Sequence, residues 1–235
     1  MPDSVLVTGA TRRIGDAIAR AFSAAGHRVI THGRSNSGGA VPDVSFDLAD
    51  FAAAEAALLK IVPLPQVLVL NASLFEPDSA LAPDWAVYQR AMAANLEGNL
   101  RLIELFLRLA PPPRTIIVLL DQKVANLNPD FFSYTLTKSA MTAAVEMIGM
   151  AMTGGDRCYG LAPGLTQPSH DQTEEEFTRS ATLNLLNRTN LPEEIGDAAV
   201  FLSRRLLANG SVMFCDSGQH LCRQRRDVMF QVRSA

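Results

Sequence analysis

The sequence begins its ordered pattern with SVLVTGATRRIGDAIARAFSAAG at residues 4–26, and this stretch determines the fold class. Residues 4–7 are an apolar run with the length of a short strand, and a glycine-containing turn at 8–15 follows directly. Residues 14–25 have the pattern of a helix, and Gly26 stands where helices often take a left-handed glycine at their C-terminus. A strand, a glycine turn and a helix in this order predict the first unit of an α/β domain.

The same alternation continues along the rest of the chain. Apolar runs predict strands at 4–7, 28–31, 44–46, 67–70, 115–120, 157–161 and 211–214. Helical patterns predict helices at 14–25, 51–60, 84–109, from 134 onward, at 174–186 and at 193–207. Strands that alternate with helices imply parallel pairing and right-handed crossovers. We therefore expect a doubly wound, Rossmann-type parallel sheet of seven strands with helices on both faces, in a single domain at 1–235.

Composition narrows the range of partners. The chain has 235 residues, 48% of them hydrophobic, which is enough for a substantial core. A net charge of −3 gives no reason to expect nucleic acid or an anionic membrane, and no apolar run has the roughly 20 residues that cross a bilayer. Three cysteines without a CxxC motif and four scattered histidines predict no disulfide framework and no metal site, which favours a cytoplasmic protein. The basic cluster at Arg223, Arg225 and Arg226 is interpreted as a solvated tail.

The turn after the first strand has the composition of a phosphate-binding loop. It reads TGATRRIG, with glycine at Gly9 and Gly15. Glycines in this position let the backbone N–H groups at a helix N-terminus approach a pyrophosphate. An ordinary tight turn is the alternative interpretation.

The end of the second predicted strand indicates which dinucleotide is bound. Residues 17–40 contain no Asp or Glu that would hold a ribose 2′-hydroxyl, whereas Arg34 and Ser35 stand at the strand end. Arg34, together with Ser35 and Arg13, is suited to hold a 2′-phosphate by charge-assisted hydrogen bonds. The sequence therefore favours NADP(H) over NAD(H).

The segment DQKVANLNPDFFSYTLTK at 121–138 carries the reactive side chains. Asp121 follows a buried strand, at the edge where open α/β sheets bind ligands, and Ser133 is suited to cap the next helix. Tyr134 and Lys138 are four residues apart, so they share a helix face. A lysine ammonium near a phenol stabilises the phenolate, which makes Tyr134 a candidate proton donor or acceptor. On its own, the pair is weak evidence, because such a pair is common by chance and is more often an exposed lysine beside a partly buried tyrosine.

Six motifs in order resemble the short-chain dehydrogenase/reductase family from about residue 8 to residue 221. They are the Thr-Gly turn with Gly15, Asp47, Asn71-Ala72, Asn95, Tyr134-x-x-x-Lys138 and Pro163-Gly164. The resemblance implies an NADP(H)-dependent oxidoreductase with Tyr134 as general acid. It implies that Lys138 lowers the pKa of Tyr134 and holds the nicotinamide ribose, and that Asn95 supports a proton-relay water. The implied cofactor contacts are Gly9, Arg13, Ile14, Gly15, Arg34, Ser35, Asp47, Leu48, Asn71, Ala72, Ser73, Lys138, Pro163, Gly164 and Thr166.

Two residues depart from the usual family pattern, and both departures point to one branch of the family. Arg13 stands where the family has its middle glycine, and Asp121 stands where the family has its catalytic serine. Both departures are similar to the pteridine reductase and dihydromonapterin reductase branch, as is the sequence Asn-Ala-Ser-Leu-Phe at 71–75. This similarity implies that Phe75 stacks on a flat pterin ring and that Ser73 and Arg13 also contact the substrate. A core position beneath a loop is the alternative for Phe75.

These features predict a reductase of a pteridine-like or other C=N or C=O small molecule. A carbonyl or 3-oxoacyl reductase is the first alternative, and a non-catalytic NADP-binding protein is the second. The polar segment at about 166–190 is the predicted lid, and its acidic run at 174–176 is interpreted as a solvated helix face. The resemblance also implies a homo-oligomer, a tetramer or a dimer, with a C-terminal tail that can reach a neighbouring subunit.

Overall fold

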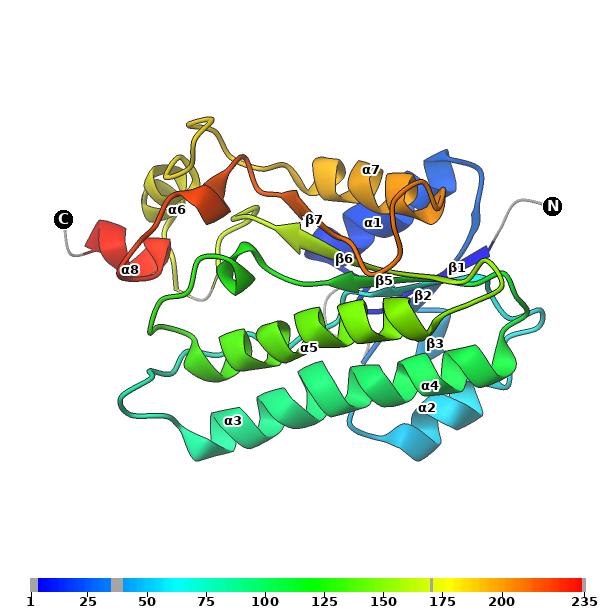
Figure 1. The fold of residues 1–235 in the computed structure, drawn as a ribbon. Coiled ribbons are helices and arrows are strands. Elements are labelled where there is room, and N and C mark those ends of the chain that lie inside the picture. Colours follow the sequence, from blue (N-terminus) through cyan, green and yellow to red (C-terminus); the bar gives the residue numbers. More distant parts are fainter. Residues whose placement is uncertain (1–3, 35–39, 170, 234–235) are drawn as a thin grey trace.

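The central feature of the structure, a computed structural model that describes residues 4–34, 40–169 and 171–233, is one seven-stranded sheet (Figure 1). The strand order is β3-β2-β1-β4-β5-β6-β7, and all six neighbouring pairs are parallel. The strands are β1 (Ser4–Val7), β2 (Arg28–Gly33), β3 (Val44–Ser45), β4 (Val67–Leu70), β5 (Thr115–Leu119), β6 (Arg157–Pro163) and β7 (Val212–Cys215). The prediction of a Rossmann-type parallel sheet is confirmed.

Helices cover both faces of this sheet, as Figure 1 shows. One face packs against α1 (Arg13–Ala24) and α7 (Pro192–Ser203), which also contact each other. The other face packs against α2 (Phe51–Leu58), α4 (Asn99–Leu109) and α5 (Phe132–Ala151). Two separate apolar cores result, one on each side of the sheet.

Strand β1 shows how the sequence builds both cores. Successive strand residues point to opposite faces of a sheet. Val5 and Val7 belong to the core beneath α1 and α7, whereas Leu6 belongs to the core beneath α4 and α5. All three side chains are fully buried, and burial of each contributes about 1.5–3 kcal/mol to stability. A strand in this position must therefore be apolar throughout.

The predicted long helix is one rod that contains a π-helical segment. Asp84 caps it by accepting the N–H groups of Ala86 and Val87 at 2.9 and 3.1 Å. The rod runs through α3 (Trp85–Ala91), the π-helical segment Met92–Gly98 and α4. π-Helical turns are common at functional sites, and this one contains Asn95.

The start of α5 differs from the sequence prediction, in which Ser133 caps the helix. Phe131 is the residue before the helix, and it adopts the left-handed conformation with φ 52° and ψ 47°. Ser133 lies inside the helix, where Asp78 accepts its N–H at 3.0 Å and its hydroxyl at 2.5 Å. The helix therefore takes its capping carboxylate from a loop 55 residues earlier, which local sequence reasoning does not detect.

The C-terminal part of the chain also differs from the prediction. After β7 the chain forms α8 (Val228–Arg233), which packs against α6 (Glu174–Ala181) (Figure 1). Arg226 pairs with the buried Asp130 at 2.7 Å, so it is not part of a solvated tail. Glu176 pairs with Arg233 at 2.9 Å, so the acidic run of α6 is only partly a solvated face. These contacts fold the tail back onto its own chain.

Two kinds of feature are absent from the described ranges 4–34, 40–169 and 171–233. No helix there is long and apolar enough to cross a membrane. No cluster of three or more His, Cys, Asp or Glu side chains in the same ranges is suited to hold a metal ion.

Candidate active site

A pocket of about 640 Å³ opens at the carboxyl ends of the strands, where parallel α/β sheets bind their ligands. The turn after β1 and the ends of β2, β4, β5 and β6 all contribute to it. Of the predicted site residues, it is lined by Gly9, Arg13, Ile14, Gly15, Arg34, Asp47, Leu48, Asn71, Ala72, Ser73, Phe75, Asp121, Tyr134, Lys138, Pro163, Gly164 and Thr166. Asn95 does not line the pocket, and Ser35 lies outside the described residues.

The turn after β1 is built for close backbone packing. Gly9 has φ +64°, a conformation that favours glycine, and a Cβ on Gly15 would overlap the carbonyl oxygen of Gly9. Thr8 Oγ1 accepts the N–H groups of Asn71 and Ala72 at 2.9 and 3.0 Å. Asn71 Nδ2 in turn donates to the carbonyl oxygen of Thr8 at 3.0 Å. The ends of β1 and β4 are thereby locked together.

The same turn presents an anion-binding helix end to the pocket. Within the described part of the chain, the residue that precedes α1, Arg12, makes no side-chain cap hydrogen bond. The first N–H groups of α1, at Arg13, Ile14 and Gly15, therefore face the pocket without a side-chain partner from the cap position. This arrangement, with the positive end of the helix dipole, fits the pyrophosphate of a dinucleotide.

Arg13 departs from the usual glycine in two ways. It has φ +56°, so a non-glycine residue holds the left-handed conformation here, which costs about 1 kcal/mol. Its Nη1 donates to the carbonyl oxygen of Pro168 at 2.8 Å, in the predicted lid. Burial also lowers the pKa of Arg13. Arg13 therefore connects the glycine-containing turn after β1 to the segment that is predicted to be the lid.

His32 supports the turn from below and was not identified from the sequence. Its Nε2 lies 3.0 Å from the carbonyl oxygen of Phe46, so this nitrogen carries the proton. Its Nδ1 then accepts the N–H of Gly9 at 3.3 Å. Burial lowers the pKa of His32, which keeps the ring neutral and preserves both bonds. A histidine at a strand end can be recognised as a buried, structural residue only when the register of the strand is known, and the sequence does not give that register.

Arg34 lines the pocket directly after β2, where the sequence predicts the 2′-phosphate of NADP(H). Its guanidinium is 66% exposed and its Nη1 lies 3.9 Å from Asp47 Oδ2, so it is only loosely paired. The main-chain carbonyl oxygen of Arg34 accepts the Ser45 hydroxyl at 3.1 Å, which fixes the backbone. An exposed arginine on a fixed backbone is suited to bind a phosphate group.

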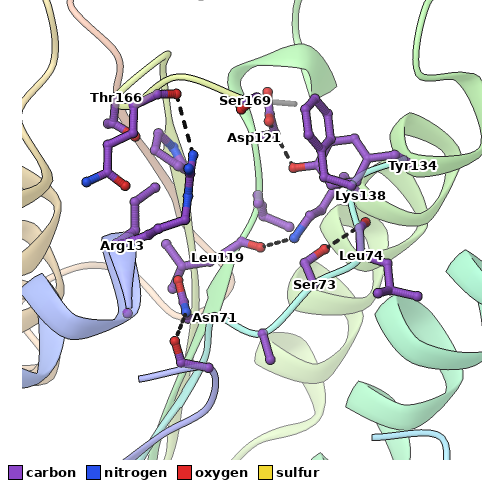
Figure 2. A pocket seen from close by; sticks show the side chains of 18 of the residues that line it. Arg13, Asn71, Ser73, Leu74, Leu119, Asp121, Tyr134, Lys138, Thr166 and Ser169 are labelled. Carbon is purple, nitrogen blue, oxygen red and sulfur yellow. Dashed lines mark hydrogen bonds between the residues drawn. The ribbon is translucent and has the colours of Figure 1, made fainter. Parts of the chain in front are cut away.

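Tyr134 and Asp121 face each other at the opposite end of the pocket. The Tyr134 hydroxyl donates to Asp121 Oδ2 at 2.9 Å (Figure 2). Burial raises the pKa of Asp121. Hydrogen bonds and nearby positive charges act to lower it, but they offset only part of the effect of burial. Burial and the charge of Asp121 raise the pKa of Tyr134 well above its ordinary value of 10. The phenol therefore keeps its proton, as a proton donor must.

The expectation that Lys138 lowers the pKa of Tyr134 is wrong for this geometry. Lys138 Nζ donates to the carbonyl oxygen of Leu119 at 2.7 Å and lies 5.4 Å from the centre of the Tyr134 ring (Figure 2). Asp121 is the nearer charge to the Tyr134 hydroxyl, and it has the opposite effect. Burial lowers the pKa of Lys138 itself to about 8.

Aromatic side chains form one wall beside Tyr134. The rings of Phe75 and Phe131 are stacked, with centroids 4.2 Å apart, and Phe75 meets the Tyr134 ring edge-on at 4.7 Å. Phe131 also stacks on Phe230 of α8, at 5.6 Å. Phe75 is thus a pocket-lining residue rather than a residue buried beneath a loop, and its backing residues come from two distant segments.

Asn95 holds the loop that carries Ser73 and Phe75. Its Oδ1 accepts the N–H of Leu74 at 2.7 Å, and its Nδ2 donates to the carbonyl oxygen of Leu74 at 2.8 Å. Both polar atoms of this buried side chain are therefore used to position a loop. Its role beside a relay water stays a prediction, and its observed contacts are those of a positioning residue.

Several pocket residues were missed by sequence reasoning, because they either neighbour a motif without belonging to its pattern or come from segments without a recognisable motif. They are Thr11, Arg12, His32, Glu76, Gln122, Lys123, Gln167, Ser169, Gln172, Gln219, Asp227, Val228 and Met229, among others. Three of these, Gln167, Ser169 and Gln172, lie in the predicted lid, and Asp227, Val228 and Met229 come from the C-terminal segment. The lid prediction agrees in position with pocket-lining residues, while closure of the lid stays a prediction.

Comparison with known proteins identifies the family. The family model described as Enoyl-(Acyl carrier protein) reductase matches residues 9–220, which is most of the chain. The chain belongs to the short-chain dehydrogenase/reductase family. It is therefore an oxidoreductase of a family that uses NAD(P).

Individual members of the short-chain dehydrogenase/reductase family match along nearly their whole length. FolM alternative dihydrofolate reductase 1 from Brucella suis, in a crystal structure with NADP, is 33% identical with a TM-score of 0.85, and the match covers 94% of this chain and 96% of that one. Galactitol 2-dehydrogenase (L-tagatose-forming) from Cereibacter sphaeroides is 30% identical, over 90% of this chain and 92% of that protein. Gluconate 5-dehydrogenase from Burkholderia cenocepacia, in complex with NADP and tartrate, is 23% identical with a TM-score of 0.82, over 92% and 94% of the two chains, and shows the shared fold.

Proposed function

We propose that the protein is an NADPH-dependent reductase of a pteridine-like heterocycle, with Tyr134 as the proton donor. The observation that carries this proposal is the 2.9 Å hydrogen bond from Tyr134 to Asp121, in a pocket that Phe75 also lines. A carboxylate beside the donor distinguishes the site from one with a neutral serine. It favours a substrate whose reacting bond is C=N and whose ring carries N–H groups.

The chemistry of the site is a hydride transfer balanced by one proton. Bound NADPH supplies the hydride to the carbon of the C=N bond. Tyr134 gives its hydroxyl proton to the nitrogen of that bond, which completes the two-electron reduction. This transfer leaves a tyrosinate, and Asp121, which accepts the hydrogen bond of the resting phenol and whose pKa is raised by burial, is placed to take up a proton from solvent and return it to Tyr134. Lys138, held by Leu119, is suited to bind the nicotinamide ribose.

The proposed substrate class is supported by likeness to a solved structure. The Brucella suis protein, 33% identical to this chain, is described as an alternative dihydrofolate reductase in complex with NADP. Dihydrofolate contains a reduced pterin ring, which is flat and carries a C=N bond. Arg13, Ser73 and Phe75 line the pocket of this chain, as the proposal requires.

A carbonyl or 3-oxoacyl reductase is the second candidate function. The matching family model is described as an acyl carrier protein reductase, and Tyr134 can protonate a carbonyl oxygen in the same position. A non-catalytic NADP-binding protein is less well supported, because Asp121, Tyr134 and Lys138 are brought together in one pocket.

A substrate screen tests the proposal directly. NADPH consumption is followed at 340 nm with dihydropterins, quinonoid pterins, diketones and 3-oxoacyl thioesters. We expect the highest kcat/KM with the dihydropterins or quinonoid pterins. Activity confined to the thioesters would instead establish the second candidate.

The preference for NADPH is expected to depend on Arg34. An Arg34→Ala variant should weaken NADPH binding by about 10- to 100-fold, because a charge-assisted bond to the 2′-phosphate is lost, and should leave NADH binding unchanged. Fluorescence titration of both cofactors measures this. Arg28→Ala is the matched control, since Arg28 is exposed at the opposite end of the same strand. An equal loss of affinity for NADPH and for NADH would show that Arg34 does not bind the 2′-phosphate.

We also propose a cytoplasmic homo-oligomer that forms through α4 and α5. The side chains of Leu136, Met147 and Met150 on α5 are exposed, and Met150 is 80% exposed. Large apolar groups on one helix are typical of an interface between copies. All three cysteines are free, in keeping with a reducing compartment.

A further inference from the structure

The C-terminal segment supplies a second carboxylate to the substrate end of the pocket. Asp227 directly precedes α8 and lines the same cavity as Asp121, Tyr134 and Phe75. Its side chain is 13% exposed, so it is largely shielded from solvent. Its charge is also close enough to contribute to the raised pKa of Tyr134.

Lys123 connects the two carboxylates. Its main-chain N–H donates to Asp121 Oδ1 at 2.9 Å, and its ammonium donates to Asp227 Oδ2, also at 2.9 Å. The ammonium is held in place by Asn128 Oδ1 at 2.8 Å, and the Lys123 side chain is only 2% exposed. A buried lysine of this kind fixes both acids relative to each other.

Asp227 is also fixed by its own backbone. Its N–H donates to Asp130 Oδ2 at 2.8 Å, and its Oδ1 accepts the N–H of Met229 at 3.0 Å. Met229 belongs to the apolar cluster that contains Tyr134 and Phe131. An ionised carboxylate has about four lone-pair positions, and these contacts with Lys123 and Met229 use two of them. The group is therefore pre-positioned and can accept further hydrogen bonds.

The carboxylates of Asp121 and Asp227 determine which class of ligand this side of the pocket can bind. Asp121 and Asp227 both act as acceptors, so a substrate that meets both must offer N–H donors. The acyl chain of a 3-oxoacyl thioester offers only carbonyl acceptors near its reacting carbon. A 2-amino heterocycle of the pterin type offers several N–H groups in the plane of a flat ring, beside the aromatic Phe75.

We propose that Asp227 is a substrate-binding residue that accepts N–H groups of a flat, 2-amino nitrogen heterocycle while the reacting bond lies at Tyr134 and Asp121. The inference rests on the proposed function and extends it by naming the residue that recognises the amino edge of the ring. The C-terminal segment then determines the substrate class from within the same chain.

The test compares Asp227→Asn with the wild type in two ways. Binding of pterin and of 2,4-diaminopyrimidine to the NADP⁺ complex is measured by fluorescence quenching, which needs no turnover. KM and kcat are measured for a dihydropterin and for a cyclic diketone. We expect binding of the two heterocycles to weaken, and KM for the dihydropterin to rise, by about 10- to 100-fold, because a charge-assisted bond is lost. KM and kcat for the diketone should change much less than KM for the dihydropterin, and the Kd for NADPH should stay unchanged, because the amino edge of the ring is the only ligand group assigned to Asp227.

Asp130→Asn is the matched control. It weakens the Arg226 ion pair and the Asp227 N–H contact that hold the same segment, but Asp130 does not line the pocket. Its effects on the heterocycle and on the diketone should be equal. The proposal is overturned if Asp227→Asn affects both ligand types equally, if Asp130→Asn reproduces its selectivity, or if the wild-type complex binds neither heterocycle. A wild type that reduces dihydropterins, with no selective loss in Asp227→Asn, would reject this inference and leave the proposed function intact.

Discussion

Replacing Tyr134 by phenylalanine is expected to lower kcat by roughly 10²- to 10⁴-fold with every substrate that the enzyme reduces. The phenylalanine ring fills the same space beside Phe75 but has no proton to give. Because burial and the charge of Asp121 raise the pKa of Tyr134, the hydroxyl of the native enzyme carries its proton across the neutral range. Stopped-flow and steady-state NADPH oxidation measure the loss, and NADPH binding should be retained.

Tyr159 provides a matched control for this change. It is a fully buried tyrosine whose hydroxyl donates to the carbonyl oxygen of Leu207 at 3.0 Å, and it does not line the pocket. Tyr159→Phe should cost about 1 kcal/mol of unfolding free energy and leave kcat unchanged. If Tyr134→Phe retained wild-type kcat, Tyr134 would not be the proton donor, and the protein would need another acid or a non-enzymatic role.

The fold was predictable because local patterns and global architecture agree. Apolar strands such as Thr115–Leu119 alternate with amphipathic helices, and a parallel sheet with two covered faces is the arrangement that buries all of them. Boundaries were less predictable. Helix α6 ends at Ala181, where the side-chain Nδ2 of Asn184 donates to the carbonyl oxygen of Ala181 at 2.7 Å in place of a backbone N–H of a further turn. Strand β6 extends to Pro163 because it pairs with β7 to that point.

The candidate site was predictable where a motif lies at a strand end. Asp121, Tyr134 and Lys138 occupy one pocket because a strand end and the following helix bring them together. Their electrostatics were not predictable from spacing, because the sequence does not show that Asp121 is nearer to the phenol than Lys138 is. Asp227 was missed for a different reason, since it reaches the pocket only through contacts with residues about 100 positions away.

Replacing Asp121 by asparagine is expected to lower the activity of the enzyme and to raise the stability of its fold. Asparagine keeps an acceptor for the Lys123 N–H but has no charge and no exchangeable carboxyl proton. We expect kcat/KM for a C=N substrate to fall by about 10²-fold, because proton supply through Asp121 is lost. At neutral pH, unfolding free energy should rise by about 1 kcal/mol or more, because a buried carboxylate is removed from the fold.

The pH dependence of this stability gain follows from the pKa of Asp121. Burial raises this pKa in the folded state, so the folded protein holds the proton to higher pH than the unfolded chain does. The favourable contribution of the carboxyl group is therefore present below its unfolded pKa and is lost as pH rises through the folded value. Asp121→Asn should exceed the wild type in urea denaturation at pH 7.5, and the difference should shrink towards pH 4.

Asp156 provides a control in which the expected change in unfolding free energy at pH 7.5 has the opposite sign. Burial acts to raise the pKa of Asp156, but hydrogen bonds and charge from Arg114 outweigh it and lower the pKa overall. Asp156→Asn should therefore destabilise the protein at pH 7.5, with a deficit that shrinks as pH falls through the folded pKa. A stability difference for Asp121→Asn that is the same at pH 7.5 and pH 4 would contradict the raised pKa of Asp121. It would also remove the reason for treating that carboxyl group as the proton source for Tyr134.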